Sequence, residues 1–195
     1  KKNCKKFLGP RYSLIKKFEY KKNIKKEKNL IFVYMGGVDN NDATTKVIKL
    51  LGSKEFLEIN KIILIGEKNT KRKKIELLIK NLKNFKLAPI VNKNLYSYFK
   101  KANLSIINAG ITMNENLSFG GKSIIILQSN FHRQIFKNSF YSKLINFVES
   151  ASKLKKDYIL KILNKNESLG VKEKRKVFFD NKGATRISNY FSNLL

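Results

Sequence analysis

Short apolar runs recur along this chain, each followed by glycine or polar residues and then by apolar residues at helical spacing. Such runs are typical of strands that are buried on both faces of a parallel sheet. Strands that alternate with helices form right-handed βαβ units. The sequence therefore predicts an α/β fold, a Rossmann-like parallel sheet with helices on both faces. The expected strands are Leu30 to Met35, Ile62 to Ile65, Leu87 to Val91, Leu104 to Ile107 and Ser123 to Leu127.

The expected helices fall between these strands and after the last one. Pro89 weakens the third strand, because proline cannot donate a hydrogen bond to a neighbouring strand. Beyond Asn130 the strand signals fade, and amphipathic stretches predict a C-terminal cover of helices. The expected helices are Asp42 to Leu51, Lys71 to Lys83, Asn94 to Lys101, Met113 to Phe119, Ile135 to Phe147, Tyr158 to Leu163 and Ala184 to Leu194.

Length and composition indicate one soluble domain. A chain of 195 residues with 42% hydrophobic residues is long enough to bury a sizeable core. No apolar run approaches the roughly 20 residues that cross a bilayer. The single Cys4 cannot form an internal disulfide, and the basic N-terminus lacks the apolar stretch of a secretory signal. We expect a cytoplasmic protein.

The formal net charge of +28 would ordinarily indicate a polyanionic partner. The excess, however, is mainly lysine scattered through the chain, together with many Asn, Ile and Phe residues. This is the bias of a genome rich in A and T, and no basic and aromatic recognition module of the usual kinds occurs. We expect no specific nucleic-acid partner, and contact with anionic membrane lipid that is at most peripheral.

Ligands of open parallel sheets gather at the carboxyl ends of the strands, where helix N-termini attract anions. The first loop at this edge begins with Gly36 and Gly37, which permit close approach of the backbone, and continues through Asp39. Asp42 is placed to cap the next helix. Taken alone, this loop is equally well explained as a tight turn between a strand and a helix.

The second loop runs from Asn108 to Glu115 and opens a helix whose first turn could hold a diphosphate. Glu115 lies one turn into that helix. A carboxylate does not favour phosphate, but it accepts hydrogen bonds from a ribose diol. The alternative is that Glu115 only complements the helix dipole near an N-terminus.

The third loop, Ser129 to Gln134, holds the single histidine, His132. A lone histidine is more often a surface or capping residue than an acid-base catalyst. The sequence shows no nucleophile motif, no metal-ligand spacing and no phosphate-binding Walker motif. We therefore expect no catalytic residue, no metal and no cofactor in this chain by itself.

Taken in order, four segments resemble the C-terminal domain of the UDP-sugar hydrolase of pseudaminic acid biosynthesis, a member of the glycosyltransferase-B-like superfamily. Phe7 to Ile15 is similar to the Gly-Pro-x-Tyr-x-Leu connection between that family's two domains. Met35 to Asp39 resembles its Phe-Gly-Gly-x-Asp loop, and Ala109 to Glu115 its small-residue loop with a following Glu. Asp180 to Ile187 is similar to its Asp-Gly-x-Gly-Ala-x-Arg-Ile segment.

The resemblance implies a role for particular residues. Gly36, Gly37 and Asp39 would border the cleft, and Glu115 would bind ribose. The diphosphate would lie against the loop formed by Ala109, Gly110, Ile111 and Thr112. His132 and Gln134 would face the sugar. Two departures weaken the match, since Val38 stands where the family often has Ser or Thr and Asn181 replaces a usual Gly.

The resemblance also implies a division of the chain. Residues 1–28 would form the interdomain connection and a basic segment, and residues 29–195 the nucleotide-sugar-binding domain, the C-terminal half of a glycosyltransferase-B-type architecture. The family's catalytic histidine lies in the other half, and no such segment precedes Lys1. We therefore expect an incomplete chain or one completed by a separate N-terminal half-domain.

For the complete enzyme the resemblance implies hydrolysis of a UDP-linked diacetamido-trideoxyhexose by attack of water, with release of UDP. Two alternatives remain open. The same loops would serve a glycosyltransferase that uses a UDP-sugar, which dependence on an acceptor would reveal. The chain could also be a non-catalytic module that only binds a nucleotide sugar.

Overall fold

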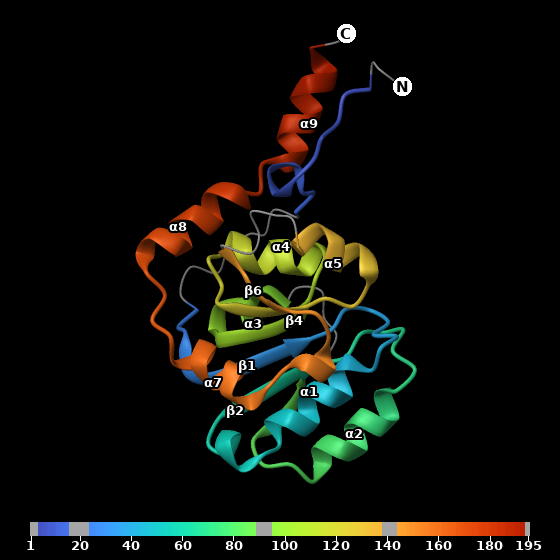
Figure 1. Cartoon of the computed structure of the whole chain (residues 1–195), viewed down its shortest axis with the longest axis vertical. Coiled ribbons are helices and arrows are strands. Elements are labelled where there is room, and N and C mark those ends of the chain that lie inside the picture. The colour runs from blue at the N-terminus through green and yellow to red at the C-terminus, as the bar shows by residue number, and fades with distance from the viewer. Residues whose placement is uncertain (1–3, 16–23, 89–94, 138–143, 194–195) are drawn as a thin grey trace.

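The computed structural model describes residues 4–15, 24–88, 95–137 and 144–193. Its centre is a sheet of six strands in the order β3-β2-β1-β4-β5-β6, with every pair of neighbours parallel (Figure 1). Phe32 in the central strand lies opposite Ile62 on one side and Ser105 on the other. The strands are β1 (Glu27–Tyr34), β2 (Asn60–Leu64), β3 (Phe85–Ala88), β4 (Ala102–Asn108), β5 (Ser123–Ile126) and β6 (Asn146–Val148).

The predicted parallel α/β sheet is confirmed, and all five expected strands occur in it. Residues 89–91, at the end of the third expected strand, lie outside the described residues. The helices of the described chain are α1 (Ala43–Leu51), α2 (Arg72–Lys80), α3 (Leu95–Lys101), α4 (Ile111–Ser118), α5 (Asn130–Lys137), α7 (Lys156–Asn164), α8 (Leu169–Phe178) and α9 (Gly183–Ser192), with short 3-10 turns at Pro10–Tyr12, Lys54–Phe56 and Ala151–Lys153.

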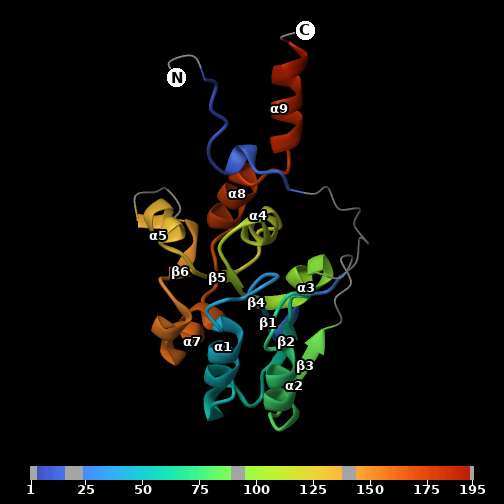
Figure 2. The same ribbon diagram turned by 90° about the vertical axis from the view of Figure 1, so that its right-hand side faces the viewer.

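Helices cover both faces of the sheet because successive residues of each strand point to opposite sides. Ile31 and Val33 of β1 pack in a core layer with α1, α2 and α7. Leu30 and Phe32 pack in a second layer with α3 and α4. Figures 1 and 2 show these helices on the two sides of the sheet. The inner strands β1, β4 and β5 are therefore buried on both faces, which accounts for their apolar runs.

The expectation of one helix from Ile135 to Phe147 is wrong. Helix α5 begins earlier, at Asn130, and Asn146–Val148 forms the edge strand β6. A three-residue strand with a polar first residue carries almost no periodic signal, so pairing with β5 decides its conformation. Helix α8 was not expected either, because charged residues dominate it and its buried side chain is an arginine, Arg175.

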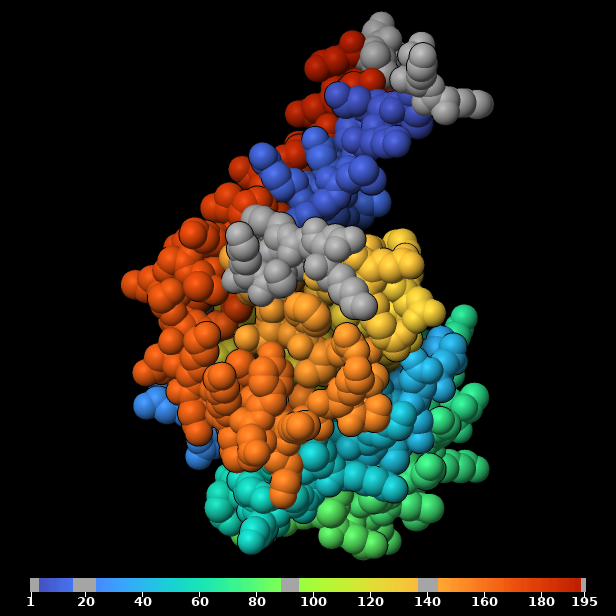
Figure 3. All heavy atoms as spheres, in the orientation of Figure 1, coloured from blue at the N-terminus to red at the C-terminus, as the bar shows by residue number. Residues whose placement is uncertain are grey.

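The first and last described segments of the chain pack against each other. The segment of residues 4–15 lies beside α9, and both project beyond the helices that cover the sheet (Figures 1, 2 and 3). The Phe7 ring meets the Tyr190 ring edge to face, with centroids 5.1 Å apart. A Cβ atom at Gly183 would lie 2.3 Å from the carbonyl oxygen of Ser13. Glycine is therefore required where α9 begins.

The expected boundary at residue 29 falls inside a strand, since β1 begins at Glu27. Residues on its N-terminal side also contribute to the domain, because Ile15 is buried in the core layer of α3 and α4. Arg186 of α9 donates hydrogen bonds to Asp180 and to the carbonyl oxygen of Arg11, the first of these at 2.8 Å. The two terminal segments that carry the family resemblance thus meet in space.

Candidate functional site

The strand order places the candidate site between β1 and β4. From β1 the chain winds outward through β2 and β3 and then returns to the other side of β1 at β4. The loops after these two strands diverge and leave a crevice at their carboxyl ends, the usual ligand position in such folds. The two glycine-containing loops singled out in the sequence follow these two strands. The structure therefore brings Gly36 and Gly37 together with the segment that follows Asn108.

The loop after β1 depends on close backbone packing. Gly36 has a φ of +86°, and a Cβ atom there would lie 3.1 Å from the side-chain nitrogen of Asn108. A Cβ atom at Gly66, after β2, would lie 2.3 Å from the carbonyl oxygen of Gly37. Gly66 was not singled out in the sequence, because a lone glycine after a strand resembles any other turn.

Asp39 is buried, and its carboxylate binds the start of α1. One oxygen accepts a hydrogen bond from the N–H of Ala43 and the other from the N–H of Thr44, each at 2.9 Å. The expectation that Asp42 caps this helix is wrong, since its side chain makes no capping bond and instead lies 3.5 Å from Lys71. Asp39 therefore fixes the loop, and the N-terminus of α1 is already occupied by a carboxylate.

The helix after β4 begins differently. Gly110 precedes α4 with a φ of +135°, and no side chain caps the helix. At the third loop, the hydroxyl of Ser129 accepts a hydrogen bond from the N–H of His132 in α5 at 3.1 Å. Of these three helix N-termini at the carboxyl edge, α4 alone therefore keeps its first N–H groups without a side-chain cap. Free N–H groups and the positive end of the helix dipole favour an anion.

Glu115 of α4 lies close to the end of β1. Burial raises the pKa of the Tyr34 phenol, and the nearby carboxylates of Glu115 and Glu67 raise it further. Both carboxylates are thus near the phenol of Tyr34, the last residue of β1. The arrangement provides hydrogen-bond acceptors at the crevice, one helical turn from the uncapped N-terminus of α4.

Two cavities include Gly37 in their lining. One, of about 360 Å³, is lined by Met35 to Asn41 together with Asn108, Gln128 and Ser129. The other, of about 280 Å³, is lined by Tyr34, Gly37 and residues 64–68. Gln128 joins two loops, because its carbonyl oxygen accepts a hydrogen bond from the Asn41 amide at 2.8 Å. Gln128 is not predicted as a site residue by any motif, and Asn108 is predicted only as the first residue of the second loop.

The residues expected on the sugar side lie on α5. His132 is half-buried and Gln134 is exposed, and the lining of the cavities around Gly37 includes neither. Burial lowers the pKa of His132, which favours its neutral form. Arg133, between them, lines an adjoining cavity of about 400 Å³. An arginine on this helix was the residue that sequence reasoning missed here.

Two negative findings apply to the described residues only. Within the described ranges, no group of three or more His, Cys, Asp or Glu side chains is arranged to hold a metal ion. Across the same part of the chain, no helix has the length and apolar character that crossing a membrane requires.

No protein-family model matches the chain, and no curated protein matches it either. Solved structures do. The chain is similar to the glycosyltransferase SnogD from Streptomyces nogalater, with 12% identity and a TM-score of 0.59 over 82% of this chain and 43% of that one. It is also similar to the glycotransferase of kitacinnamycin, with 10% identity and a TM-score of 0.67 over 93% of this chain and 48% of that one.

A third similar structure is the N-terminal domain of trehalose-6-phosphate phosphatase from Candida albicans, with 11% identity and a TM-score of 0.51 over 87% of this chain and 43% of that one. The chain thus spans less than half the length of each of these three proteins. At such low identity the likeness concerns the fold alone. The six-stranded parallel sheet with its two layers of helices is a Rossmann-like α/β fold, and it is similar over the aligned region to domains of these solved structures.

Proposed function

We propose that this chain binds a UDP-sugar in the crevice between β1 and β4 and is the nucleotide-sugar-binding half of a UDP-sugar enzyme. The observation that carries the proposal is the uncapped N-terminus of α4, which opens onto the crevice behind Gly110. A diphosphate there would receive backbone hydrogen bonds and the helix dipole. The Rossmann-like fold supports the proposal, because its ligands lie at this switch point of the strand order.

The other residues take roles that follow from this placement. Gly36 and Gly37 leave room for the ligand to approach the backbone. Asp39 acts indirectly, because both its oxygens hold α1 and thereby fix the loop. Glu115, beside Tyr34, would accept hydrogen bonds from the ribose hydroxyls. His132 or Gln134 would reach the sugar only from the side of α5. Arg133, which lies between them on this helix, is a further candidate for contact with the sugar.

Two reaction classes fit such a half-enzyme. The family resemblance of the sequence favours hydrolysis, in which water displaces UDP from the sugar. The names of two similar structures, a glycosyltransferase and a glycotransferase, favour transfer of the sugar to an acceptor. In both cases this domain would stabilise the diphosphate leaving group, and a second half-domain would supply the catalytic base.

Calorimetric titration tests the binding proposal. We expect UDP to bind this chain more tightly than CMP at physiological salt, and a short oligonucleotide to compete poorly. Equal or absent binding of the two nucleotides would contradict the proposal. A chain that binds UDP can then be mixed with a candidate first half-domain, and UDP release measured with and without an acceptor. Release without an acceptor indicates a hydrolase, whereas strict dependence on an acceptor indicates a transferase.

A further inference from the structure

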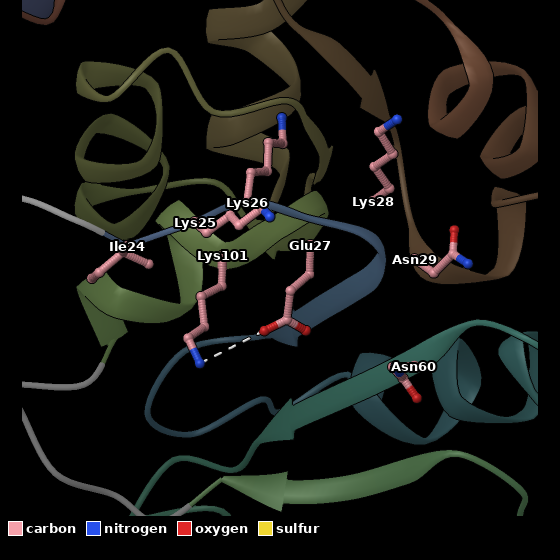
Figure 4. A pocket seen from close by; sticks show the side chains of 8 residues that line it. All are labelled: Ile24, Lys25, Lys26, Glu27, Lys28, Asn29, Asn60 and Lys101. Carbon is pink, nitrogen blue, oxygen red and sulfur yellow. Dashed lines mark ion pairs between the residues drawn. The ribbon is translucent and has the colours of Figure 1, made fainter.

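A second pair of cavities lies at the opposite edge of the sheet, where the strands begin. One has a volume of about 820 Å³ and is lined by residues 24–29, Asn60 and Lys101 (Figure 4). The other, of about 610 Å³, adjoins it and shares Lys26, Lys28 and Asn29 in its lining. Both volumes lie within the range of small-molecule sites, roughly 300 to 1,000 Å³. This edge is distinct from the crevice proposed for the UDP-sugar.

Charged side chains at the start of β1 point to two opposite sides of the strand. Figure 4 shows Lys26 and Lys28 extending to one side and Glu27 to the other, as expected for alternating residues of an extended chain. Glu27 lies 3.7 Å from the ammonium group of Lys101. Its carboxylate is therefore paired with another lysine and does not neutralise Lys26 or Lys28.

The cavity of about 610 Å³ is lined by cations and amides. Its ten described lining residues are three lysines, four asparagines and three aliphatic side chains, with no carboxylate among them. The third lysine, Lys122, is buried and donates hydrogen bonds to the carbonyl oxygens of Leu163 at 2.6 Å and Lys165 at 3.2 Å. Lys122 thus binds the C-terminal end of α7 and adds a positive charge to the wall of the cavity.

Outside the lining, the carboxylate of Glu167 acts electrostatically on Lys26 and Lys122, but it is already engaged. Glu167 forms two hydrogen bonds to the guanidinium group of Arg175, at 2.7 and 2.9 Å, and both side chains are almost fully buried. Lys172 of α8 adds another positive charge. Partial burial lowers the pKa of Lys26, and repulsion by Lys172 lowers it further. The fold therefore holds these like charges close together.

We propose that this lysine and asparagine cavity is a binding site for a phosphate group, carried either by a free phosphorylated compound or by a phospholipid headgroup. Ammonium groups bind phosphate oxygens as point charges, and asparagine amides donate further hydrogen bonds. A doubly charged anion would relieve the repulsion among Lys26, Lys122 and Lys172. The aliphatic residues of the cavity wall are Ile59, which directly precedes β2, and Leu160 and Leu163 of α7, and they fit the carbon skeleton of the ligand.

The test compares two double variants that each remove two positive charges. Lys26→Gln with Lys28→Gln alters the cavity but leaves the structural Lys122 in place. Lys49→Gln with Lys73→Gln removes two exposed lysines from α1 and α2. Each protein, with the crevice between β1 and β4 first saturated with UDP, is titrated with inorganic pyrophosphate and, separately, with vesicles of phosphatidylglycerol and phosphatidylcholine in equal parts. A circular-dichroism melt shows that each variant is folded.

We expect the cavity variant to bind at least about tenfold more weakly than the unaltered chain, and the surface variant to bind within about twofold of it. Loss of pyrophosphate binding identifies a free phosphorylated ligand, and loss confined to the vesicles identifies a lipid headgroup. Equal weakening in both variants would overturn the proposal, because diffuse charge would then explain the binding. Absence of binding to either probe, or tighter binding of a short oligonucleotide that needs Lys26 and Lys28, would also overturn it.

Discussion

At the scale of single residues, the buried pair of Arg175 and Glu167 is the clearest electrostatic contribution to stability. Arg175 also donates a hydrogen bond to the carbonyl oxygen of Leu144 at 2.7 Å, so it joins α8 to the segment before β6. We expect Glu167→Ala to lower the free energy of unfolding by about 3 to 5 kcal/mol, because it leaves a buried charge without its partner. Denaturant titration measures this loss.

A neighbouring glutamate provides the control. Glu173 lies on α8, the helix that carries Arg175, and its exposed carboxylate is 2.9 Å from the ammonium group of Lys176. Glu173→Ala should change the free energy of unfolding by less than about 1 kcal/mol. Similar losses for the two variants would mean that the Glu167 pair is no more important than a surface pair.

Glu115 is the residue on which the proposed recognition of ribose depends. We expect Glu115→Ala to weaken UDP binding by about 1 to 3 kcal/mol, because charge-assisted hydrogen bonds to the ribose hydroxyls are lost. Calorimetry on the folded variant measures the change, and Glu173→Ala serves as the charge-matched control. Unchanged affinity for UDP in the Glu115 variant would refute this role.

The loops of the candidate site are predictable from the sequence, but the contacts of the side chains within them are not. The two glycines and the small-residue turn were recognisable because both features have a local cause. That Asp39 rather than Asp42 holds α1 depends on backbone angles in the loop, where Asp39 has a φ of 53°. The burial of Arg175 depends on groups that are distant in the sequence, such as the carbonyl oxygens of Gly121 and Leu144. No local sequence pattern therefore predicts it.

At the scale of elements, the contact between the loops after β1 and β2 is tight enough to test by adding one methyl group. Gly66→Ala would force its Cβ atom against the carbonyl oxygen of Gly37, so we expect a loss of about 1 to 3 kcal/mol in the free energy of unfolding. UDP binding should weaken as well, because the loop after β1 must shift.

Gly170 in α8 is the control position for Gly66→Ala, since a Cβ atom at Gly170 would meet nothing within 4 Å. Gly170→Ala should leave stability unchanged or raise it by up to about 1 kcal/mol through helix propensity. Thermal melts of the two variants provide the comparison. If Gly66→Ala were as stable as Gly170→Ala, the close approach of the two loops would be contradicted.

The tie between α9 and the N-terminal segment predicts a dependence on pH. A hydrogen bond from Arg186 lowers the pKa of Asp180 below its ordinary value of 3.8. The ionised carboxylate therefore stabilises the folded state above pH 3.8, and this contribution is lost as the pH falls through the lowered pKa. The stability difference between the unaltered chain and Asp180→Asn should shrink in that range, as measured by denaturant titration at several pH values. A difference that stays constant would contradict the tie.

The helices and strands that could be predicted from the sequence are those with a clear pattern of apolar residues. Strands β1, β2, β4 and β5 are buried on both faces and could be predicted from their sequences. Strand β6 and helix α8 could not, because one is a short edge strand and the other is held largely by an arginine. In both, contacts with distant parts of the chain decide the conformation.

At the scale of the whole molecule, two edges of one sheet carry different chemistry. The carboxyl edge presents glycine loops, an uncapped helix and carboxylates near Tyr34. The amino edge presents lysines and asparagines around Lys26 and Lys122. No sequence pattern indicates the second edge, since Lys122 is far along the chain from Lys26 and Lys28 and the whole chain has a net charge of +28. The strand order brings them together.

An amide NMR titration of the labelled chain with UDP tests the central claim most directly. We predict that the largest shifts concentrate in Gly36, Gly37 and the segment from Ala109 to Thr112, with smaller changes in α5. The amides of Lys26, Lys28 and Asn29 at the opposite edge should change little. Shifts concentrated at that opposite edge, or spread evenly among the lysines, would contradict a UDP-sugar site between β1 and β4.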